Sequence, residues 1–316
     1  MPRPVSISRS SPTRIALAFA AVYLIWGSTY LTIRIAIQTI PPMLMSATRF
    51  VIAGLILFAL VYRPGARHER LTKQQWRDAL IIGGCLLLGG NGIVSWGEQY
   101  VGSGYMALIV GSVPLWMALL APMFGGRRVS LLAGVGVGVG LAGVALLVRP
   151  SGASMHWQSI AVLGSPLLWS IGSLYAQRAA MPRNALTATA MEMVTGGVLM
   201  GIVGLAAGEA GRVHLGAVSS SSWIAFAYLI AFGSLVGYSC YIWLLGRVTS
   251  TAVSTYAYVN PLVAVALGAI VLGESITPIT LGAGAMIIFA VALILSSRAL
   301  QSRRRPALEP AISDVA

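Results

Sequence analysis

The sequence predicts an all-α membrane protein with ten transmembrane helices, arranged as two inverted repeats of five helices, N-in and C-in. Of its 316 residues, 57% are hydrophobic and only 9% are charged, whereas a soluble domain carries about 25% charged residues. Ten apolar stretches follow one another, each near the roughly 20 residues that cross a hydrocarbon core. Two of these stretches also match each other in sequence but end in different charge, which is typical of an inverted repeat.

The repeat is clearest between residues 101–126 and 248–273, of which six of 26 aligned positions are identical. The first copy runs into two arginines, and the second runs into Glu274 with no basic residue nearby. Because basic residues stay on the cytoplasmic side of an inner membrane, one copy ends inside and the other outside. Inverted repeats with broken helices near the midplane recur among secondary transporters. The identical pairs include Pro114 with Pro261 and Gly126 with Gly273.

The ten predicted spans alternate in direction, starting from a cytoplasmic tail at residues 1–14. The first span begins like a signal peptide but continues through Trp26, so it is interpreted as an uncleaved helix. The first repeat occupies residues 15–148, an external connector residues 149–156, and the second repeat residues 157–298. A basic, then Pro- and Ala-rich tail at 299–316 is predicted to be cytoplasmic and disordered. In order, the spans are residues 15–37, 44–62, 78–98, 103–125, 130–148, 157–175, 185–207, 223–245, 251–273 and 280–297.

The distribution of basic residues supports this topology. Seventeen of the 21 Lys and Arg residues fall in segments predicted to be cytoplasmic, and only Arg149 and Arg212 in external ones. Arg34 and Arg49 lie in or near outer helix ends. Topology therefore explains the net charge of +13 better than nucleic-acid binding does, and no nucleic-acid partner is expected.

No motif points to catalysis, a metal or a cofactor. The run from Gly138 to Gly143 fits a dinucleotide-binding pattern, but it lies inside an apolar span with no preceding strand. We interpret it as close helix packing through Gly134, Gly136, Gly138 and Gly140. The cysteines and histidines show no metal-ligand spacing. Hydrolase and nucleotide-binding patterns are missing from the sequence, so the chain is not expected to be an enzyme.

Two tryptophans are the first candidates for substrate contact. Trp26 and Trp169 each fall about a dozen residues into a span, hence near mid-bilayer, at corresponding places of the two repeats. Interfacial anchoring, the usual role of a membrane tryptophan, does not suit that depth. They either line a cavity or pack helix against helix, and the sequence leaves both open. Tyr30 follows Trp26 by about one turn.

Three polar residues lie within apolar spans. Asn91, Asn260 and Glu192 would each cost several kcal/mol in lipid unless they meet a partner or a wet cavity. Glu192 is the one carboxylate well inside a span, and it serves either coupling or a structural hydrogen bond to a serine or the backbone. Two further carboxylates at outer helix ends are expected to be solvated caps or partners of arginines: Glu98 and Glu274, with Arg34 and Arg49.

The paired prolines are candidate hinges. Each removes one backbone hydrogen bond from its helix and frees the carbonyl four residues before it. Pro114 and Pro261 occupy matching places in helices of opposite direction, so each should weaken its helix at a similar depth. Weak points of this kind suit a carrier that opens alternately to either side.

A series of short motifs runs in order along nearly the whole chain: Ile25-Trp-Gly-Ser-Thr-Tyr30, Pro41-Pro42, Arg49-Phe50, Gly90-Asn-Gly92, Glu98, Ser103-Gly104, Val113-Pro114-Leu115, Glu192-Met193, Tyr256-Ala-Tyr-Val-Asn-Pro261 and Gly273-Glu274. In these motifs the chain resembles the EamA family, the ten-helix branch of the drug/metabolite transporter superfamily. It is most similar to bacterial inner-membrane permeases of the YedA type, with the amino-acid exporter YddG as a relative. The resemblance implies two EamA repeats around a central cavity and export of small metabolites. The cavity candidates it implies are Trp26, Tyr30, Asn91, Trp169, Tyr241, Tyr256 and Asn260.

The expected function is therefore an inner-membrane, multi-pass secondary transporter that exports small amphipathic metabolites, with amino acids as the leading class, by alternating access. A multidrug or other metabolite permease of the same fold is the alternative. A solute channel would need a continuous polar stripe, and too few polar residues are available for one. The expected partners are a small-molecule substrate and the lipid bilayer, and the chain is expected to be a monomer or a weak homo-oligomer.

Overall fold

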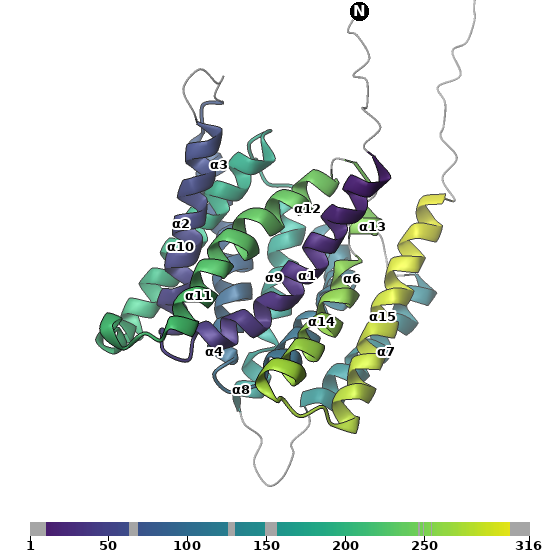
Figure 1. Cartoon of the computed structure of the whole chain (residues 1–316). Coiled ribbons are helices and arrows are strands. Elements are labelled where there is room, and N and C mark those ends of the chain that lie inside the picture. The colour runs from purple at the N-terminus through teal and green to yellow at the C-terminus, as the bar shows by residue number, and fades with distance from the viewer. Residues whose placement is uncertain are drawn as a thin grey trace, which may run out of the picture.

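The computed structural model is a bundle of helices (Figure 1). It describes residues 11–62, 69–125, 130–148, 157–245, 247–248, 250–253 and 255–303. Every regular element in these ranges is helical. Eight stretches are long and apolar enough to cross a membrane, and Leu131–Leu147 and Tyr256–Leu272 are shorter apolar helices. Together they confirm the all-helical prediction with ten spans.

The first half contains five spans, two of which are built from several consecutive helical segments. They are α1 (Pro12–Ala36), α2 (Pro42–Val61), α3 (Lys73–Gly83) continued by η1 (Gly84–Gly92) and α4 (Ile93–Gly97), α5 (Ser103–Val110) followed by α6 (Val113–Leu120) and η2 (Ala121–Phe124), and α7 (Leu131–Val148).

The second half repeats this order. Its spans are α8 (Trp157–Ala161) with α9 (Gly164–Ala176), α10 (Ala185–Ala206), α11 (Ser220–Tyr228) continued by η5 (Leu229–Val236) and α12 (Gly237–Leu245), α13 (Ser250–Val253) with α14 (Tyr256–Leu272), and α15 (Pro278–Arg303). Two short turns, η3 (Glu209–Arg212) and η4 (Leu215–Ala217), follow α10.

The start of α1 and the end of α15 lie at one end of the bundle, while α8 begins at the opposite end (Figure 1). This arrangement agrees with both termini on one side of the membrane. The predicted connector at 149–156 lies outside the described residues.

Two element ends differ from the sequence-based expectation by five residues or more. The third span begins at Lys73, five residues before the predicted Asp78. A capping box explains this earlier start. The Thr72 hydroxyl accepts a hydrogen bond from the Gln75 backbone N–H at 3.2 Å, and the Gln75 side-chain oxygen accepts one from the Thr72 backbone N–H at 2.8 Å. At the other end of the chain, α15 continues to Arg303, so residues 299–303 are helical instead of belonging to the tail.

Equivalent helices of the two halves make equivalent contacts. The second spans pack on each other as α2 and α10, and the fifth spans do so as α7 and α15. The first span of each half packs against the fourth span of the other, as α1 with α14 and α9 with α6. It also packs against the third, as α1 with α12 and α9 with η1.

The third span of each half changes to a π-helix in its middle, at η1 and at η5. A tryptophan of the opposite half packs on a glycine in or beside each π-helix. A Cβ atom at Gly90 would lie 2.5 Å from Cε3 of Trp169, and one at Gly237 would lie 2.4 Å from Nε1 of Trp26. Because a methyl group cannot occupy either place, glycine is required for this approach. Both tryptophans therefore pack helix against helix.

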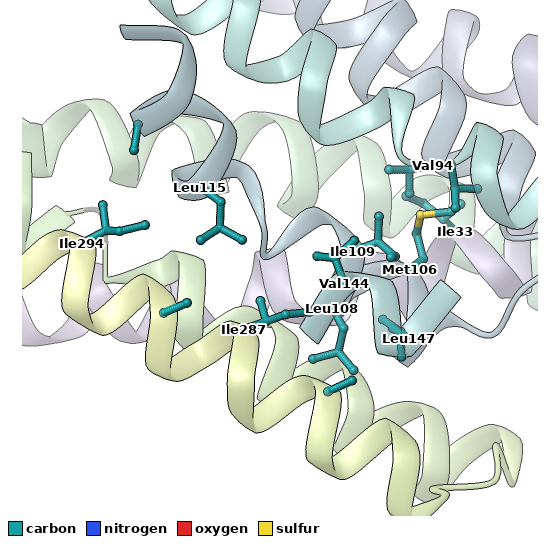
Figure 2. Close-up of a cluster of buried hydrophobic side chains, with 14 of the residues drawn as sticks. Ile33, Val94, Met106, Leu108, Ile109, Leu115, Val144, Leu147, Ile287 and Ile294 are labelled. Carbon is teal, nitrogen blue, oxygen red and sulfur yellow. The ribbon is translucent and has the colours of Figure 1, made fainter. Parts of the chain in front are cut away.

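The main apolar core lies where α5 and α6 meet α7 and α15 (Figure 2). The glycines of α7 let that helix approach α15 closely: Cβ atoms at Gly136 and Gly140 would lie 3.0 Å and 2.9 Å from Ala290. The packing interpretation is thus confirmed for these two glycines. The packing interpretation is wrong for Gly134 and Gly138, because a Cβ atom added at either position would meet no neighbouring element within 4 Å.

The fourth spans of the two halves break at different places. In the first half the helix is interrupted between α5 and α6, so Pro114 lies in the first turn of α6 and not mid-helix as expected. An N–H at this first-turn position would have no carbonyl of the same helix to bond, so proline costs no helical hydrogen bond there. In the second half, Pro261 lies inside the continuous α14. A left-handed glycine closes each span, at Gly125 (φ 59°) and Gly273 (φ 65°), so the match of Gly273 in the first half is Gly125, one residue before the aligned Gly126.

The contact of Trp169 with Gly90 generates a stability prediction. Gly90→Ala should destabilise the protein by about 1–3 kcal/mol, because the new methyl group forces the indole or the helix to move. Gly138→Ala is the matched control: it faces open space and should be neutral or stabilising, since alanine favours helix. Thermal unfolding of both variants in detergent, followed by tryptophan fluorescence, measures the difference. Equal melting temperatures for the two variants would contradict the packing described.

Candidate functional site

Four aromatic side chains from three spans meet where α1, α12 and α14 pack together. The Trp26 ring of α1 lies 5.3 Å from that of Tyr238, 5.2 Å from that of Tyr241 and 5.3 Å from that of Tyr256, between ring centroids. Its indole N–H donates to the Gly233 carbonyl of η5 at 3.2 Å. We refer to these four residues, Trp26, Tyr238, Tyr241 and Tyr256, as the aromatic cluster. Such rings offer apolar faces together with polar edges.

Most of the predicted cavity residues on α1, α12 and α14 belong to this cluster or border it. Tyr30 lies about one turn beyond Trp26 on α1 and packs against the main apolar core. Asn260 lies one turn beyond Tyr256 and is buried, and its Oδ1 has no hydrogen-bond partner. A buried amide oxygen without a partner is costly, which is a reason to consider it for function.

Asn91 and Trp169 lie apart from the aromatic cluster, in η1 and α9. No ring contact joins Trp169 to the cluster among the residues that the structure describes. Beside it, the Ser165 hydroxyl donates to the Gly90 carbonyl at 3.1 Å. The predicted cavity residues therefore divide into two groups. One lies on α1, α12 and α14, and the other, Asn91 and Trp169, lies on η1 and α9.

Six acidic residues are described, and four of them hold the two halves together. Each of the four accepts a hydrogen bond from backbone N–H groups of the other half. Exposed N–H groups at helix starts and turns need such partners, and a carboxylate there also suits the helix dipole. The pairs are Glu69 with Arg183 (3.0 Å), Asp78 with Ala180 (2.8 Å), Glu209 with Met43 (3.3 Å) and Leu44 (2.9 Å), and Glu274 with Ser103 (2.7 Å) and Gly104 (3.0 Å).

The other two described acids, Glu98 and Glu192, are not held in this way. Glu98 is fully buried and neither of its oxygens has a hydrogen-bond partner, so its predicted role as a solvated cap is wrong. The alternative role as an ion-pair partner is not observed either, because no described salt bridge joins Glu98 to Arg34 or Arg49. Glu274 does act as a cap, although of α5 across the halves. No hydrogen bond within the described chain reaches the Glu192 carboxyl, so the structural bond considered for it is not formed there.

Arg49 is the functional candidate that the sequence-based reasoning missed. It lies two turns into α2 and is only 4% exposed, and no described carboxylate forms an ion pair with it. Its Nε donates to the Ser234 hydroxyl at 2.9 Å, and its guanidinium stacks 4.6 Å from the centre of the Phe50 ring. The available signal was a charged residue inside an apolar span. Tyr238, also missed, belongs to the aromatic cluster and packs against the apolar side chains around Phe50.

The described residues contain no group of three His, Cys, Asp or Glu side chains placed to hold a metal ion. The interior features that remain are an aromatic cluster, a guanidinium and a carboxyl, from α1, α2, α10, α12 and α14. Such features suit recognition of a small molecule that is apolar in one part and charged in another.

The number, length and apolar character of these helices define a multi-pass membrane protein. The chain belongs to the EamA-like transporter family, whose model matches residues 13–149 and 156–296, one repeat in each half. The family resemblance predicted from the sequence is therefore confirmed.

Two of three similar proteins are named as transporters. The inner membrane transporter YedA of Escherichia coli K12 is 37% identical over 300 residues, which cover 94% of this chain and 95% of that one. Protein PagO of Salmonella typhimurium is 27% identical, with 83% and 86% of the two chains covered. The Bacillus subtilis transporter YvbV is 26% identical, with 89% and 92% covered. None of these three names states a substrate.

A solved crystal structure shares the fold. It superimposes with a TM-score of 0.63 at 20% identity and covers 94% of this chain and 100% of its own.

The contrast between the two types of acid generates a prediction. Glu274→Gln should destabilise the protein by about 1–3 kcal/mol, because an amide replaces a carboxylate that accepts from two backbone N–H groups. Glu98→Gln removes a buried acid without partners and should be neutral or stabilising. Melting temperatures of both variants, measured against the unsubstituted protein in one detergent, test this. A larger loss for Glu98→Gln would mean that its carboxyl has a partner.

Proposed function

We propose that this chain is a secondary transporter of the bacterial inner membrane that exports small amphipathic metabolites, amino acids first, by alternating access. The observation that carries the proposal is the aromatic cluster beside unpaired charged groups inside the membrane-spanning bundle. Polar groups at that depth are costly and are retained where they face a substrate or ion pathway. The YedA name, which states an inner membrane transporter, supports the location.

An inverted relation of the two halves supports alternating access. The pairings of the second spans, of the fifth spans, and of each first span with the third and fourth spans of the other half all have counterparts with the halves exchanged. The two tryptophans, which pack beside opposite π-helices, follow the same relation. An odd number of spans in each half makes the halves antiparallel in the membrane. Two such halves can exchange their conformations, which opens the site to one side and then to the other.

We assign the hinges to the fourth spans. The interruption between α5 and α6 touches the proline of the equivalent span: a Cβ at Gly111 would lie 2.9 Å from Cγ of Pro261. The two weak points of the bundle thus meet near its middle, and a shift of one span is felt by the other. Pro114 begins the helix on the far side of that interruption.

Counterflow in proteoliposomes tests the proposed function. Purified protein in vesicles preloaded with an unlabelled amino acid should accumulate the labelled amino acid transiently and saturably. Trp26→Ala should reduce this rate at least ten-fold for aromatic and long aliphatic amino acids, because the cluster loses its central ring. Trp76→Ala, on the partly exposed end of α3, is the control and should keep the rate. Uptake that never saturates would indicate a channel, and counterflow of cationic drugs alone would indicate a multidrug permease.

The hinge assignment predicts a separation of binding from transport. Pro261→Ala restores the N–H that can bond the Ala257 carbonyl and should stiffen α14. Substrate affinity should therefore stay within about two-fold, while the counterflow rate falls several-fold. Pro114→Ala should have a smaller effect, since a first-turn residue has no such bond to restore. An unchanged counterflow rate in Pro261→Ala would remove α14 as a hinge.

A further inference from the structure

We propose that Arg49 is the centre of an anion site inside the bundle, and that this site binds one small monovalent inorganic anion such as chloride. The Nη groups of the guanidinium and the hydroxyl of Ser234 donate to the anion. This inference goes beyond the proposed transport function, because it concerns an ion that the purified protein binds whatever molecule it carries across the membrane.

Arg49 points into the bundle instead of toward the membrane surface. It is the eighth residue of α2, about 10 Å along that helix, and it is buried. Its Nε donates to the Ser234 hydroxyl at 2.9 Å, and a Cβ atom at Gly233 would lie 3.0 Å from its Nη2. Both residues belong to η5, the π-helix of the third span of the other half. The side chain therefore does not extend back to the interface, as that of an arginine near a helix end can.

No group of the described chain balances the charge of Arg49. Four of the six described acids accept from backbone amides elsewhere, and no salt bridge joins Arg49 to either of the others. Buried charges in proteins are normally paired, because transfer of an unpaired charge out of water is very costly. The contact with the Phe50 ring offsets only part of that cost. An anion from solution supplies the missing charge.

The donors that an anion needs lie close together. A guanidinium carries five N–H donors in one plane, and the Phe50 ring, which stacks on it, uses none of them. Within the described chain only the Nε–H has an acceptor, the Ser234 oxygen. The Ser234 hydroxyl in turn donates to no acceptor among the described residues, so its hydrogen is available beside the guanidinium. Charge-assisted N–H donors next to a hydroxyl are suited to an anion.

The surroundings select a small, singly charged ion. Arg49 and Ser234 are both buried, so a large anion cannot reach them unless a helix moves. A divalent anion such as sulfate would bring a second, unbalanced charge into the interior. Binding also removes water from the anion, which costs less for bromide, nitrate or chloride than for fluoride. Since a guanidinium is itself weakly hydrated, we expect bromide and nitrate to bind at least as tightly as chloride, and fluoride the least.

The anion site adjoins the aromatic cluster through Gly233. This residue contacts the Arg49 guanidinium, and its carbonyl accepts the Trp26 indole N–H at 3.2 Å. Arg49 and Trp26 thus meet the same residue of η5. A heavy halide bound at Arg49 therefore lies close enough to Trp26 to quench its fluorescence.

Thermal unfolding of the purified full-length protein in detergent measures the binding. Sodium gluconate is replaced stepwise by sodium chloride at constant ionic strength, so that only the anion changes. The melting temperature should rise saturably, by about 2–3 °C at ten times the dissociation constant, because the anion binds only the folded state. Equal melting temperatures in gluconate and in chloride overturn the inference. Stabilisation by acetate or benzoate but not by halides overturns it too, since the site then takes the carboxylate of an organic molecule.

Variants assign the response to Arg49. Arg49→Gln should abolish the chloride response, whereas the control Arg183→Gln, which removes an exposed arginine, should keep it. If Arg49→Gln does not fold, Arg49→Lys keeps the charge without the planar fork of donors, and chloride affinity should fall about three-fold or more. A chloride response in Arg49→Gln equal to that of the unsubstituted protein, or an unchanged affinity in Arg49→Lys, indicates a general salt effect and overturns the assignment.

Quenching by iodide locates the ion. The unsubstituted protein should show a saturable component of quenching, displaced by chloride, in addition to the collisional quenching of its eight tryptophans. This component should be missing from Trp26→Phe and from Arg49→Gln. A saturable component that persists in either variant places the anion elsewhere and overturns the inference. None of these measurements requires transport, so their failure leaves the proposed function in place, and a lack of counterflow leaves the anion site in place.

Discussion

The structure depends on satisfying backbone N–H groups inside a membrane, where water is not available to do so. Helices satisfy most of them, but each helix start and turn leaves several open. This chain has few acids, and four of those described close such groups across the two halves. Glu209 and Glu274 hold amides of the first half at the outer end, while Glu69 and Asp78 hold amides of the second half at the inner end.

These bonds define what a conformational change must break. In the proposed alternating access, a movement that opens the halves toward the outside would separate Glu209 and Glu274 from α2 and α5 and would leave the inner pair bonded. A movement toward the inside does the reverse. Because the two sets lie at opposite ends, a bundle of this kind can loosen one end while the other remains bonded, as alternating access requires.

Apolar side chains and polar side chains have different roles in the interior of the bundle. Glycines let Trp26 and Trp169 approach the π-helices of the opposite half, and apolar side chains of α5, α6, α7 and α15 form a core that needs no substrate. By contrast, Arg49 and Glu192 lie beside the aromatic cluster with hydrogen-bonding groups that the described chain does not use. Buried polar groups without hydrogen-bond partners destabilise the protein when no ligand is bound. A ligand that forms those hydrogen bonds is therefore bound more tightly than one that does not.

Sequence alone determined the membrane class, the ten spans to within a few residues at most ends, the family and the equivalence of the two tryptophans. These follow from composition, apolar length and repeat, which are local properties of the chain. Tertiary structure decided the π-helices, the interruption before Pro114, the capping of one half by acids of the other, and the position of Arg49 beside Ser234 and Tyr238. Each of these features depends on which segments meet in space. Arg49 and Ser234 are 185 positions apart, and no local sequence pattern predicts a contact over that separation.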